Sequence, residues 1–398
     1  MLNLLSVLVL FIVSISGLYL WVIALAGVRA PKLPKPSDHL KRFAIAVPAH
    51  NEESIIGQTV AALRSLDYPS ELYKIYIVAD FCSDQTADEA RSQGAICFER
   101  KEGERGGKGN ALIWLFKQIQ LSCNNFDAIV IFDADTQVEP GFLKAMNNRL
   151  NQGALVIQGQ HIISNPRAGW FPALTWAMMT IDNRFSNQGR SNLNLSAKHM
   201  GDSICFRSEI LENLGWGSGL TEDYEFRLRL LLEGIRIQYE PSARGYGQAP
   251  LFWKEAQAQR QRWARGMADA GKQYRQQLLS EGVRENNWSK LDGALMTFLP
   301  SYSTLSLISI AILIFNLVFM IYVWHALIIL WAFLAFLCFI YPLFGLILVK
   351  APAWAYLAII SGPIFMFWRT WLNLRVRLFQ RDIPWVRTPH KGTKPIDK

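Results

Sequence analysis

The chain has 398 residues, of which 51% are hydrophobic, and its 41 Lys and Arg outnumber its 32 Asp and Glu to give a formal net charge of +9. The apolar surplus lies mostly at the two ends, which indicates a membrane protein with a soluble middle. The basic residues gather near the apolar segments and in the tail, so anionic lipid head groups explain the charge better than nucleic acid does. Five cysteines without paired spacing indicate neither a zinc site nor a disulfide framework, and they suit a reducing cytoplasm.

The first membrane segment is expected at residues 4–27, which are almost wholly apolar and long enough to span a bilayer. They lack the basic region and the cleavage pattern of a signal peptide, so residues 1–28 are predicted to hold a retained transmembrane helix. The linker at residues 29–42 is basic. By the positive-inside bias, the N-terminus is expected outside and the domain that follows in the cytoplasm.

From residue 43 onward, short apolar runs alternate with helical periodicity. Strands are expected at residues 43–47, 75–79, 95–98 and 128–132, and helices at residues 54–66, 86–93, 110–121 and 141–150. This alternation predicts an α/β domain over residues 43–280, with a Rossmann-like, mainly parallel sheet and helices on both faces. Residues 170–185 and 253–279 mix aromatic, apolar and polar or basic side chains, which is typical of helices lying on a membrane; ordinary surface helices are the alternative.

A C-terminal membrane region is expected at residues 293–372, with apolar stretches at 301–323, 326–349 and 353–372. Three full spans would place the tail at residues 373–398 outside, but its many Arg and Lys residues favour the cytoplasm. We therefore expect one of the three stretches to be re-entrant or interfacial. The result is a multi-pass membrane protein with a cytoplasmic domain and a cytoplasmic tail.

Two carboxylates directly follow the strand expected at residues 128–132. Asp133 and Asp135 are separated only by Ala134 and lie at the carboxyl edge of the predicted sheet, where open α/β sheets bind ligands. Close carboxylates repel unless positive charge lies between them, and a hard divalent cation that carries a diphosphate suits such oxygen ligands. Two acids in an ordinary turn are the alternative.

Polar residues also follow the first two predicted strands. The first strand leads into Pro48-Ala49-His50-Asn51-Glu52-Glu53, and the second ends in Asp80. An acid in that place commonly accepts hydrogen bonds from a ribose or a base. Ser83 and Asp84 come next, and capping of the following helix would explain them equally well.

A glycine-rich turn, Arg105-Gly106-Gly107-Lys108-Gly109-Asn110, precedes the next helix. Its glycines allow close backbone approach, and Lys108 adds positive charge where a helix N-terminus favours an anion. The turn does not have the P-loop pattern, and glycine-rich surface turns are common.

Two later motifs lie on predicted helices. Thr221 suits the N-cap of a helix running to about residue 233, and the helix dipole would keep Asp223 ionised, as a general base requires. Gln259, Arg262 and Trp263 share one face of the helix at 253–279, where Arg262 could hold a diphosphate and Trp263 could support a sugar ring. A helix cap and an interfacial aromatic and arginine pair are the structural alternatives.

Together and in this order, these motifs resemble the membrane-bound family 2 glycosyltransferases, which include the cellulose, chitin, hyaluronan and poly-N-acetylglucosamine synthases. The resemblance covers about residues 43–270. It implies a GT-A fold, a nucleotide-sugar donor that is usually UDP-linked, and Mg²⁺ or Mn²⁺. An inverting transfer that forms a β-glycosidic bond would follow from one in-line displacement on an α-linked donor.

The resemblance also implies a role for each motif residue. Asp223 would be the catalytic base and Asp135 would hold the metal. The acceptor and the diphosphate would meet Glu222, Gln259, Arg262 and Trp263. The nucleotide-sugar would be bound by Pro48, Ala49, Asn51, Glu52, Asp80, Lys108, Asp133 and Ala134. Departures from the usual family pattern concern donor and acceptor preference: Phe81, the extra glycine before Lys108, residues 201–203, and Gly247-Gln248-Ala249-Pro250, which lacks an acid before its proline.

Three functions remain open on the sequence. The first is a transferase that extends a polysaccharide, because the glutamine-arginine-tryptophan motif is often associated with processive synthases; an export partner for the polymer is left open. The second is a transferase that adds one sugar to a membrane lipid, favoured by the small number of expected spans. The third is a catalytically silent membrane scaffold, which the complete set of aspartates argues against.

Overall fold

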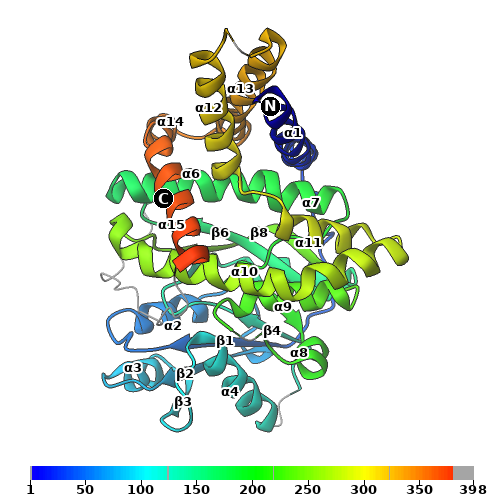
Figure 1. Cartoon of the computed structure of the whole chain (residues 1–398). Helices are drawn as coiled ribbons and strands as arrows, with labels where there is room; N and C mark the ends of the chain where they lie inside the picture. The colour runs from blue at the N-terminus through cyan, green and yellow to red at the C-terminus, as the bar shows by residue number, and fades with distance from the viewer. Residues whose placement is uncertain (1, 123–124, 218, 322, 380–398) are drawn as a thin grey trace.

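A computed structural model describes residues 2–122, 125–217, 219–321 and 323–379. Most of the basic tail predicted for residues 373–398 therefore lies outside the described residues, as does Cys123. A sheet of eight strands forms the centre of the α/β domain that the sequence predicts at residues 43–280 (Figure 1).

The sheet has the strand order β3-β2-β1-β4-β7-β6-β8-β5. Neighbours β3, β2, β1 and β4 are parallel, as are β6 and β8, whereas β7 is antiparallel to both β4 and β6, and β5 is antiparallel to β8. The four predicted strands are confirmed, and the second half of the sheet is added by strands that were not predicted. The strand bounds are β1 Phe43–Ala49, β2 Tyr73–Asp80, β3 Ile96–Arg100, β4 Ala128–Ile131, β5 Gln137–Val138, β6 Val156–Ile163, β7 Ile204–Arg207 and β8 Ile237–Gly247.

Helices cover both faces of the sheet because its central strands are apolar on both sides. In β4, Val130 packs on one face with α2 (Ile56–Arg64), α3 (Thr86–Ser92) and α5 (Phe142–Asn151). Its neighbours Ile129 and Ile131 pack on the other face with α4 (Lys108–Leu121), α8 (Ser208–Leu214) and α9 (Glu222–Leu232). This alternation follows the two-residue period of a strand. Short 3₁₀ turns at Ser70–Leu72 and Pro166–Ala168 complete the connections.

Long helices run across the domain outside these layers. Helix α6 (Trp170–Asp182) separates the sheet from a group of apolar helices in Figure 1, and it continues through a π-helical segment (Asn183–Gln188) into α7 (Gly189–Asn192). Helix α10 (Trp253–Arg284) packs against α9 and leads into α11 (Trp288–Phe298). Both stretches that were predicted to be interfacial are therefore helical.

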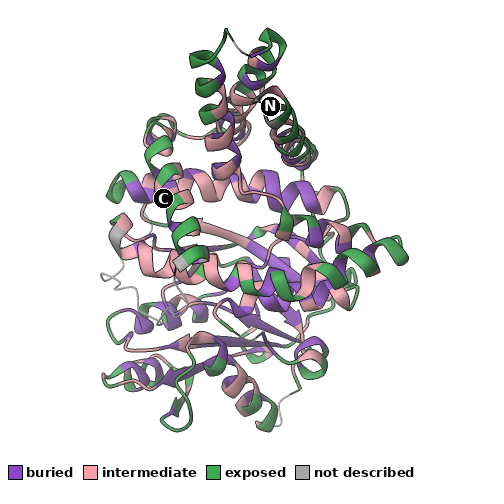
Figure 2. Cartoon of the chain, in the orientation of Figure 1, coloured by how far each residue is buried: buried purple, intermediate pink, exposed green. Residues whose placement is uncertain are grey.

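The apolar helices α1 (Leu2–Ala26), α12 (Tyr302–Val318) and α13 (His325–Leu348) project together from the domain. Many of their side chains are exposed (Figure 2). Within the described residues, Ser6–Ala26 and His325–Leu348 are long and apolar enough to cross a membrane. Helices α11 and α12 would add a third span only as a pair bent by 52°.

The third apolar stretch, at residues 353–372, does not form one helix. It is divided into α14 (Ala353–Ile359), which packs on α6, and α15 (Gly362–Phe379), which packs on α10 and α12. Neither has the length and composition of a span. The number of membrane spans and the sidedness of the chain remain predictions.

A buried ionic cluster centred on Asp292 of α11 joins four helices. Its carboxylate accepts hydrogen bonds from the Tyr19 hydroxyl of α1 at 2.6 Å and from Arg190 Nε of α7 at 2.9 Å. Arg227 Nη2 of α9 lies 3.8 Å from the same carboxylate. We call these four residues the Asp292 cluster. It ties the first apolar helix to the helix whose first turn carries Asp223.

Candidate active site

The polar strand ends predicted from the sequence open into a single continuous cavity of about 1640 Å³. Asp80 at the end of β2 and Asp133 and Asp135 after β4 line one part of it. Asp223 and Arg262 line the next part. Small-molecule pockets typically have about 300–1,000 Å³. This site cavity therefore has room for a second ligand beside the first.

Asp80 is paired with a cation that the sequence reasoning did not identify. Arg100 Nη1 lies 2.6 Å from Asp80 Oδ1, and both side chains are buried. Burial raises the pKa of Asp80, while Arg100 opposes that rise. The His50 Nδ1–H donates to the Asp80 carbonyl oxygen at 2.7 Å, so His50 Nε2 is free to accept from Arg105 at 2.6 Å. These contacts hold the ends of β1 and β2 together.

Lys108 bridges the first aspartate to the loop before β7. Its ammonium group forms an ion pair with Asp133 and donates to the Gly201 carbonyl oxygen at 2.5 Å. Burial would lower the pKa of Lys108, but the negative charges of Asp133 and Glu222 raise it overall. The glycine-rich turn thus delivers a permanent positive charge to the site, as predicted.

Asp202 organises the loop that carries the aspartate pair, and the sequence reasoning gave it no role. Its Oδ1 accepts from the Asp133 amide and the Thr136 hydroxyl, each at 3.0 Å. Its Oδ2 accepts from His161 Nδ1 at 2.7 Å. Burial works against the charged carboxylate, but the bond to His161 lowers the pKa of Asp202. The signal in the sequence was a polar run, residues 201–203, directly before a strand that pairs with β4.

Asp223 lies in the first turn of α9, and its Oδ1 accepts from the Tyr224 amide at 2.8 Å. The helix dipole was expected to keep it ionised, but burial has the larger effect and raises the pKa of Asp223. Burial, followed by the neighbouring Asp223 charge, raises the pKa of Glu222 to about 7. A carboxylate with a raised pKa is a better proton acceptor near neutral pH.

The expected side-chain cap at the start of α9 is wrong. Thr221 is at the N-cap position, but it makes no capping hydrogen bond, and its hydroxyl is buried without a partner within the described chain. The cause is the close approach of α10, since a Cβ on Gly266 would lie 2.4 Å from Thr221 Oγ1. The packing of α10 against α9 therefore holds Thr221 in a position where its hydroxyl does not cap the helix.

Gln259, Arg262 and Trp263 of α10 all line the site cavity, as their spacing predicted. Arg262 lies close enough to Asp223 and Glu222 to lower the pKa of both. The Trp263 ring remains 38% exposed. This helix face therefore brings a cation and an aromatic ring to the same cavity as Asp223.

Asp135, which is predicted to hold the metal, lines the site cavity beside Asp133. Its Oδ2 accepts from the Gln248 amide at 3.4 Å. Across the described ranges, no group of three or more His, Cys, Asp or Glu residues is arranged to hold a metal ion. Mg²⁺ is commonly bound by one or two carboxylates together with substrate phosphates. The residues present therefore suit a metal that arrives with a diphosphate.

Comparison with known proteins agrees with this geometry. The family model described as glycosyltransferase like family 2 matches residues 41–266. A probable glycosyltransferase, YdaM of Bacillus subtilis, is 30% identical over 259 residues, covering 59% of this chain and 57% of its own length. The beta-monoglucosyldiacylglycerol synthase of Synechocystis is 28% identical over 56% of this chain and 47% of its own length.

The chain belongs to glycosyltransferase family 2, because the family model covers more than half of it. It spans about half the length of the curated relatives it matches. The mannosyltransferase PcManGT from Pyrobaculum calidifontis, solved with GDP-Man and Mn²⁺, has a similar fold, with a TM-score of 0.58 at 16% identity over 96% of this chain and 99% of that one. The GT-A fold is thus confirmed.

Most of the predicted site residues meet in the site cavity, although their individual roles remain predictions. Two do not line it. Asn51 instead accepts from the Ser83 amide at 2.8 Å, and Glu222 packs behind the cavity against Gly109. The predicted residues that line the cavity are Pro48, Ala49, Glu52, Asp80, Lys108, Asp133, Ala134, Asp135, Asp223, Gln259, Arg262 and Trp263.

Gly201 offers a test of how closely the site is packed around Asp223. It has φ +78°, and an added Cβ would lie 3.0 Å from Asp223 Oδ2. We expect Gly201→Ala to lower kcat by about 10- to 100-fold, because a shift of the base by a fraction of an ångström is enough for such a loss. Steady-state kinetics of sugar transfer would measure it.

Gly153 provides the matched control. Its φ of +89° imposes a similar backbone strain on alanine, but nothing lies within 4 Å of an added Cβ. Gly153→Ala should therefore cost stability without slowing transfer. Equal kcat losses in both variants would show that strain alone, and not contact with Asp223, is responsible.

Proposed function

We propose that this chain transfers one sugar from a nucleotide-sugar, in the first instance a UDP-sugar, to a hydroxyl of a membrane lipid. Asp223 acts as the general base in an inverting reaction that forms a β-glycosidic bond. The observation that carries the proposal is the continuity of the site cavity. From Asp133 and Asp135 it passes Asp223 and reaches residues of the apolar helices α12 and α13.

The membrane side of the cavity fits a lipid. Ile310 of α12 and Phe339 and Leu343 of α13 line it, and Phe339 is 65% exposed. Apolar walls that open at the surface of a membrane-type helix group would let a lipid enter sideways, because its chains remain in an apolar environment. The acceptor's hydroxyl would then approach Asp223 from the side opposite the aspartate pair.

The proposed reaction needs one proton transfer and one displacement. Asp223 takes the proton of the acceptor hydroxyl, and the oxygen attacks the anomeric carbon as the bond to the diphosphate breaks. Arg262 and Lys108 stabilise the negative charge that develops on the diphosphate. A single displacement inverts the anomeric centre.

A divalent metal fits this site as Mg²⁺ or Mn²⁺ held by Asp135 and the donor's phosphate oxygens. When bound, it would neutralise charge on the departing diphosphate. Asp133 would contact the nucleotide, and Asp80, fixed by Arg100, would meet the nucleoside. Because Arg100 holds the Asp80 carboxylate in one position, Asp80 can accept hydrogen bonds from the nucleoside with a fixed geometry.

The rate of the proposed reaction should fall on acidification. Protonated Asp223 cannot accept the acceptor's proton, so activity is lost as the pH falls through its pKa. Burial raises that pKa, Lys108 and Arg262 oppose the rise, and the adjacent Glu222 titrates near 7. We expect the acid limb of kcat/KM to lie above the ordinary range of an aspartate, which is about pH 4. A profile that stays flat down to pH 4 would contradict the assignment of the base.

Extension of a polysaccharide is the second candidate, supported by the arrangement of Gln259, Arg262 and Trp263 on one wall of the cavity. A polymer and a glycolipid differ in product length. Purified protein in nanodiscs would be given a panel of UDP-sugars and GDP-mannose with Mg²⁺ or Mn²⁺, and products would be analysed by mass spectrometry. Lipids that carry one sugar support the first candidate, whereas long chains from one acceptor support the second.

A further inference from the structure

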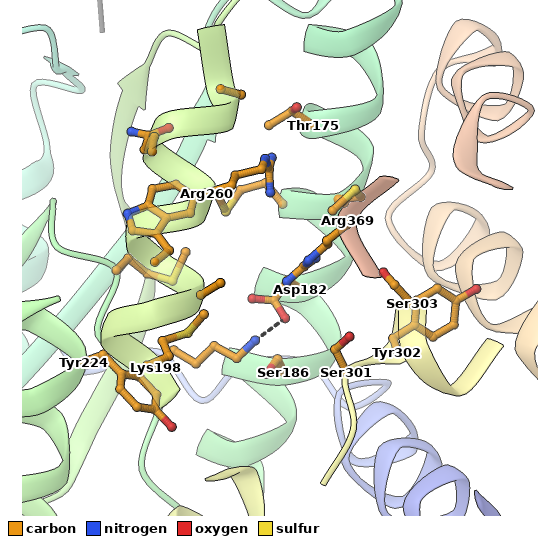
Figure 3. A pocket seen from close by; sticks show the side chains of 18 of the residues that line it. Thr175, Asp182, Ser186, Lys198, Tyr224, Arg260, Ser301, Tyr302, Ser303 and Arg369 are labelled. Atoms are coloured by element: carbon orange, nitrogen blue, oxygen red, sulfur yellow. Dashed lines mark hydrogen bonds and ion pairs between the residues drawn. The ribbon is translucent and has the colours of Figure 1, made fainter. Parts of the chain in front are cut away.

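Two arginines that form no ion pair or hydrogen bond within the described chain line the membrane side of the site cavity. Arg260 of α10 and Arg369 of α15 point into the same space beside α6 (Figure 3). Within the described part of the chain, neither guanidinium forms an ion pair or a hydrogen bond, and Arg260 Nε is buried without a partner. Each guanidinium carries five N–H donors. Such groups are normally paired when they are removed from bulk water.

The surroundings of this arginine pair carry excess positive charge. Burial, and then the nearby Arg369, lower the pKa of Arg260 to about 9. Asp182 of α6 lies beside Arg369 and is already bound by Lys198 at 2.6 Å. Lys198 and Arg369 therefore share one anion, and Arg260 adds a further positive charge near Arg369. The local charge balance favours a further anionic group between the two arginines.

Aromatic rings explain how Arg260 is held but leave its donors unused. Its guanidinium carbon lies 5.7 Å from the Phe171 ring centre, 5.8 Å from Trp263 and 5.0 Å from Phe365. In cation–π contacts of this kind the cation lies over the face of an aromatic ring and needs no hydrogen-bond acceptor. The N–H edges of the guanidinium stay available for the bidentate bonds that arginine makes to phosphate oxygens.

The arginine pair is separate from the donor side of the cavity. Arg262 is the residue of α10 whose charge acts on Asp223, whereas the charge that acts on Arg260 is that of Arg369. Residues 260 and 262 are two apart on a helix and so point in nearly opposite directions. Arg369 lies near Ser303, at the start of the apolar wall formed by α12 (Figure 3).

We propose that Arg260 and Arg369 bind the phosphate of the acceptor lipid, so that the acceptor is a phospholipid with a free hydroxyl in its head group. The phosphate lies between the two guanidinium groups, the acyl chains follow the apolar wall of α12 and α13, and the head-group hydroxyl extends to Asp223. The role as an acceptor site rests on the proposed function. The binding of a lipid phosphate does not, and it can be tested separately.

The test measures lipid binding to the full chain in a neutral maltoside detergent by native mass spectrometry. Phosphatidylglycerol carries the phosphate and a free hydroxyl, and diacylglycerol lacks the phosphate. The wild type should bind phosphatidylglycerol at least about 10-fold more tightly. Arg260→Gln and Arg369→Gln should each weaken it by about 10- to 100-fold, the range for a charged hydrogen-bonding group, and leave diacylglycerol unchanged.

Arg265→Gln is the matched control, because Arg265 lies on the same helix, bonds Asp269 at the surface at 2.8 Å and does not line the cavity. Arg369→Lys keeps the charge and should retain most of the binding. This variant shows whether weak binding by Arg369→Gln comes from the lost charge or from misfolding. Equal binding of the two lipids by the wild type overturns the proposal. So does an Arg260→Gln variant that binds like Arg265→Gln.

A parallel arm with inorganic phosphate separates the two sources of the anion. Millimolar phosphate could raise the melting temperature of the wild type but not of Arg260→Gln. If it does, and if the wild type binds phosphatidylglycerol no more tightly than diacylglycerol, the site takes a free anion and the lipid assignment is wrong. The same binding assay in the Asp223→Asn variant should give unchanged lipid affinity. Intact binding of phosphatidylglycerol without transfer from any donor would overturn the proposed function and leave the phosphate site standing.

Discussion

Replacement of Asp223 by asparagine should lower sugar transfer by about 10²–10⁴-fold, the usual contribution of a general base. Asp223 is half-buried in the first turn of α9, and it can accept a proton only as the ionised carboxylate. Asparagine keeps the size and the hydrogen bond from the Tyr224 amide. Donor affinity should therefore change little, and the loss should appear in kcat.

Asp269→Asn is the control for this substitution. Asp269 is a half-exposed aspartate on α10 that bonds Arg265 and lies outside the site cavity. It should retain full activity. If Asp223→Asn transfers sugar as fast as the wild type, Asp223 is not the base. If the variant transfers no sugar but keeps its biological function, the chain acts as a catalytically silent scaffold.

Replacement of Asp292 by asparagine should lower the free energy of unfolding by about 3–5 kcal/mol, because it leaves buried arginines without their counter-ion. Arg190 and Arg227 are almost fully buried, and Asp292 is the carboxylate that both approach. Thermal or denaturant unfolding in detergent would measure the loss.

Asp67→Asn is the matched surface control. Asp67 bonds Lys144 at 2.5 Å with both side chains more than half exposed, and such pairs contribute about 0–1 kcal/mol. If Asp292→Asn lowers the free energy of unfolding as little as Asp67→Asn does, water or local rearrangement compensates for the lost negative charge beside Arg190 and Arg227. The difference between the two variants isolates the effect of burial.

The first half of the sheet could be predicted because its strands are buried on both faces and read as unbroken apolar runs. β6 could not, since polar residues interrupt it and its register with β8 shifts between Gly159 and Gln160. The same limit explains why the antiparallel strand β7 was missed: its four residues lie between a polar loop and a helix start. Short or irregular strands carry too little periodicity to be seen in sequence.

The candidate site was predictable where chemistry follows directly from a strand end or a helix start. Asp80, Asp133 and Asp223 are in such places, and all three meet in one cavity. Arg100, Asp202 and the pair of Arg260 and Arg369 were missed because their roles depend on contacts between distant parts of the chain. The direction of the pKa shift of Asp223 was mispredicted for the same reason. Burial by the surrounding helices raises this pKa by more than the dipole of α9 lowers it.

The Asp292 cluster has a consequence for where in a bilayer the enzyme can work. Tyr19 belongs to α1, and Arg227 lies one turn beyond Asp223 on α9, about 6 Å along the helix axis. With α1 inserted in a membrane, the buried cluster holds Asp223 at one fixed depth. The enzyme would then select acceptors by the height at which a hydroxyl stands above the acyl chains, and a longer or shorter head group would miss the base.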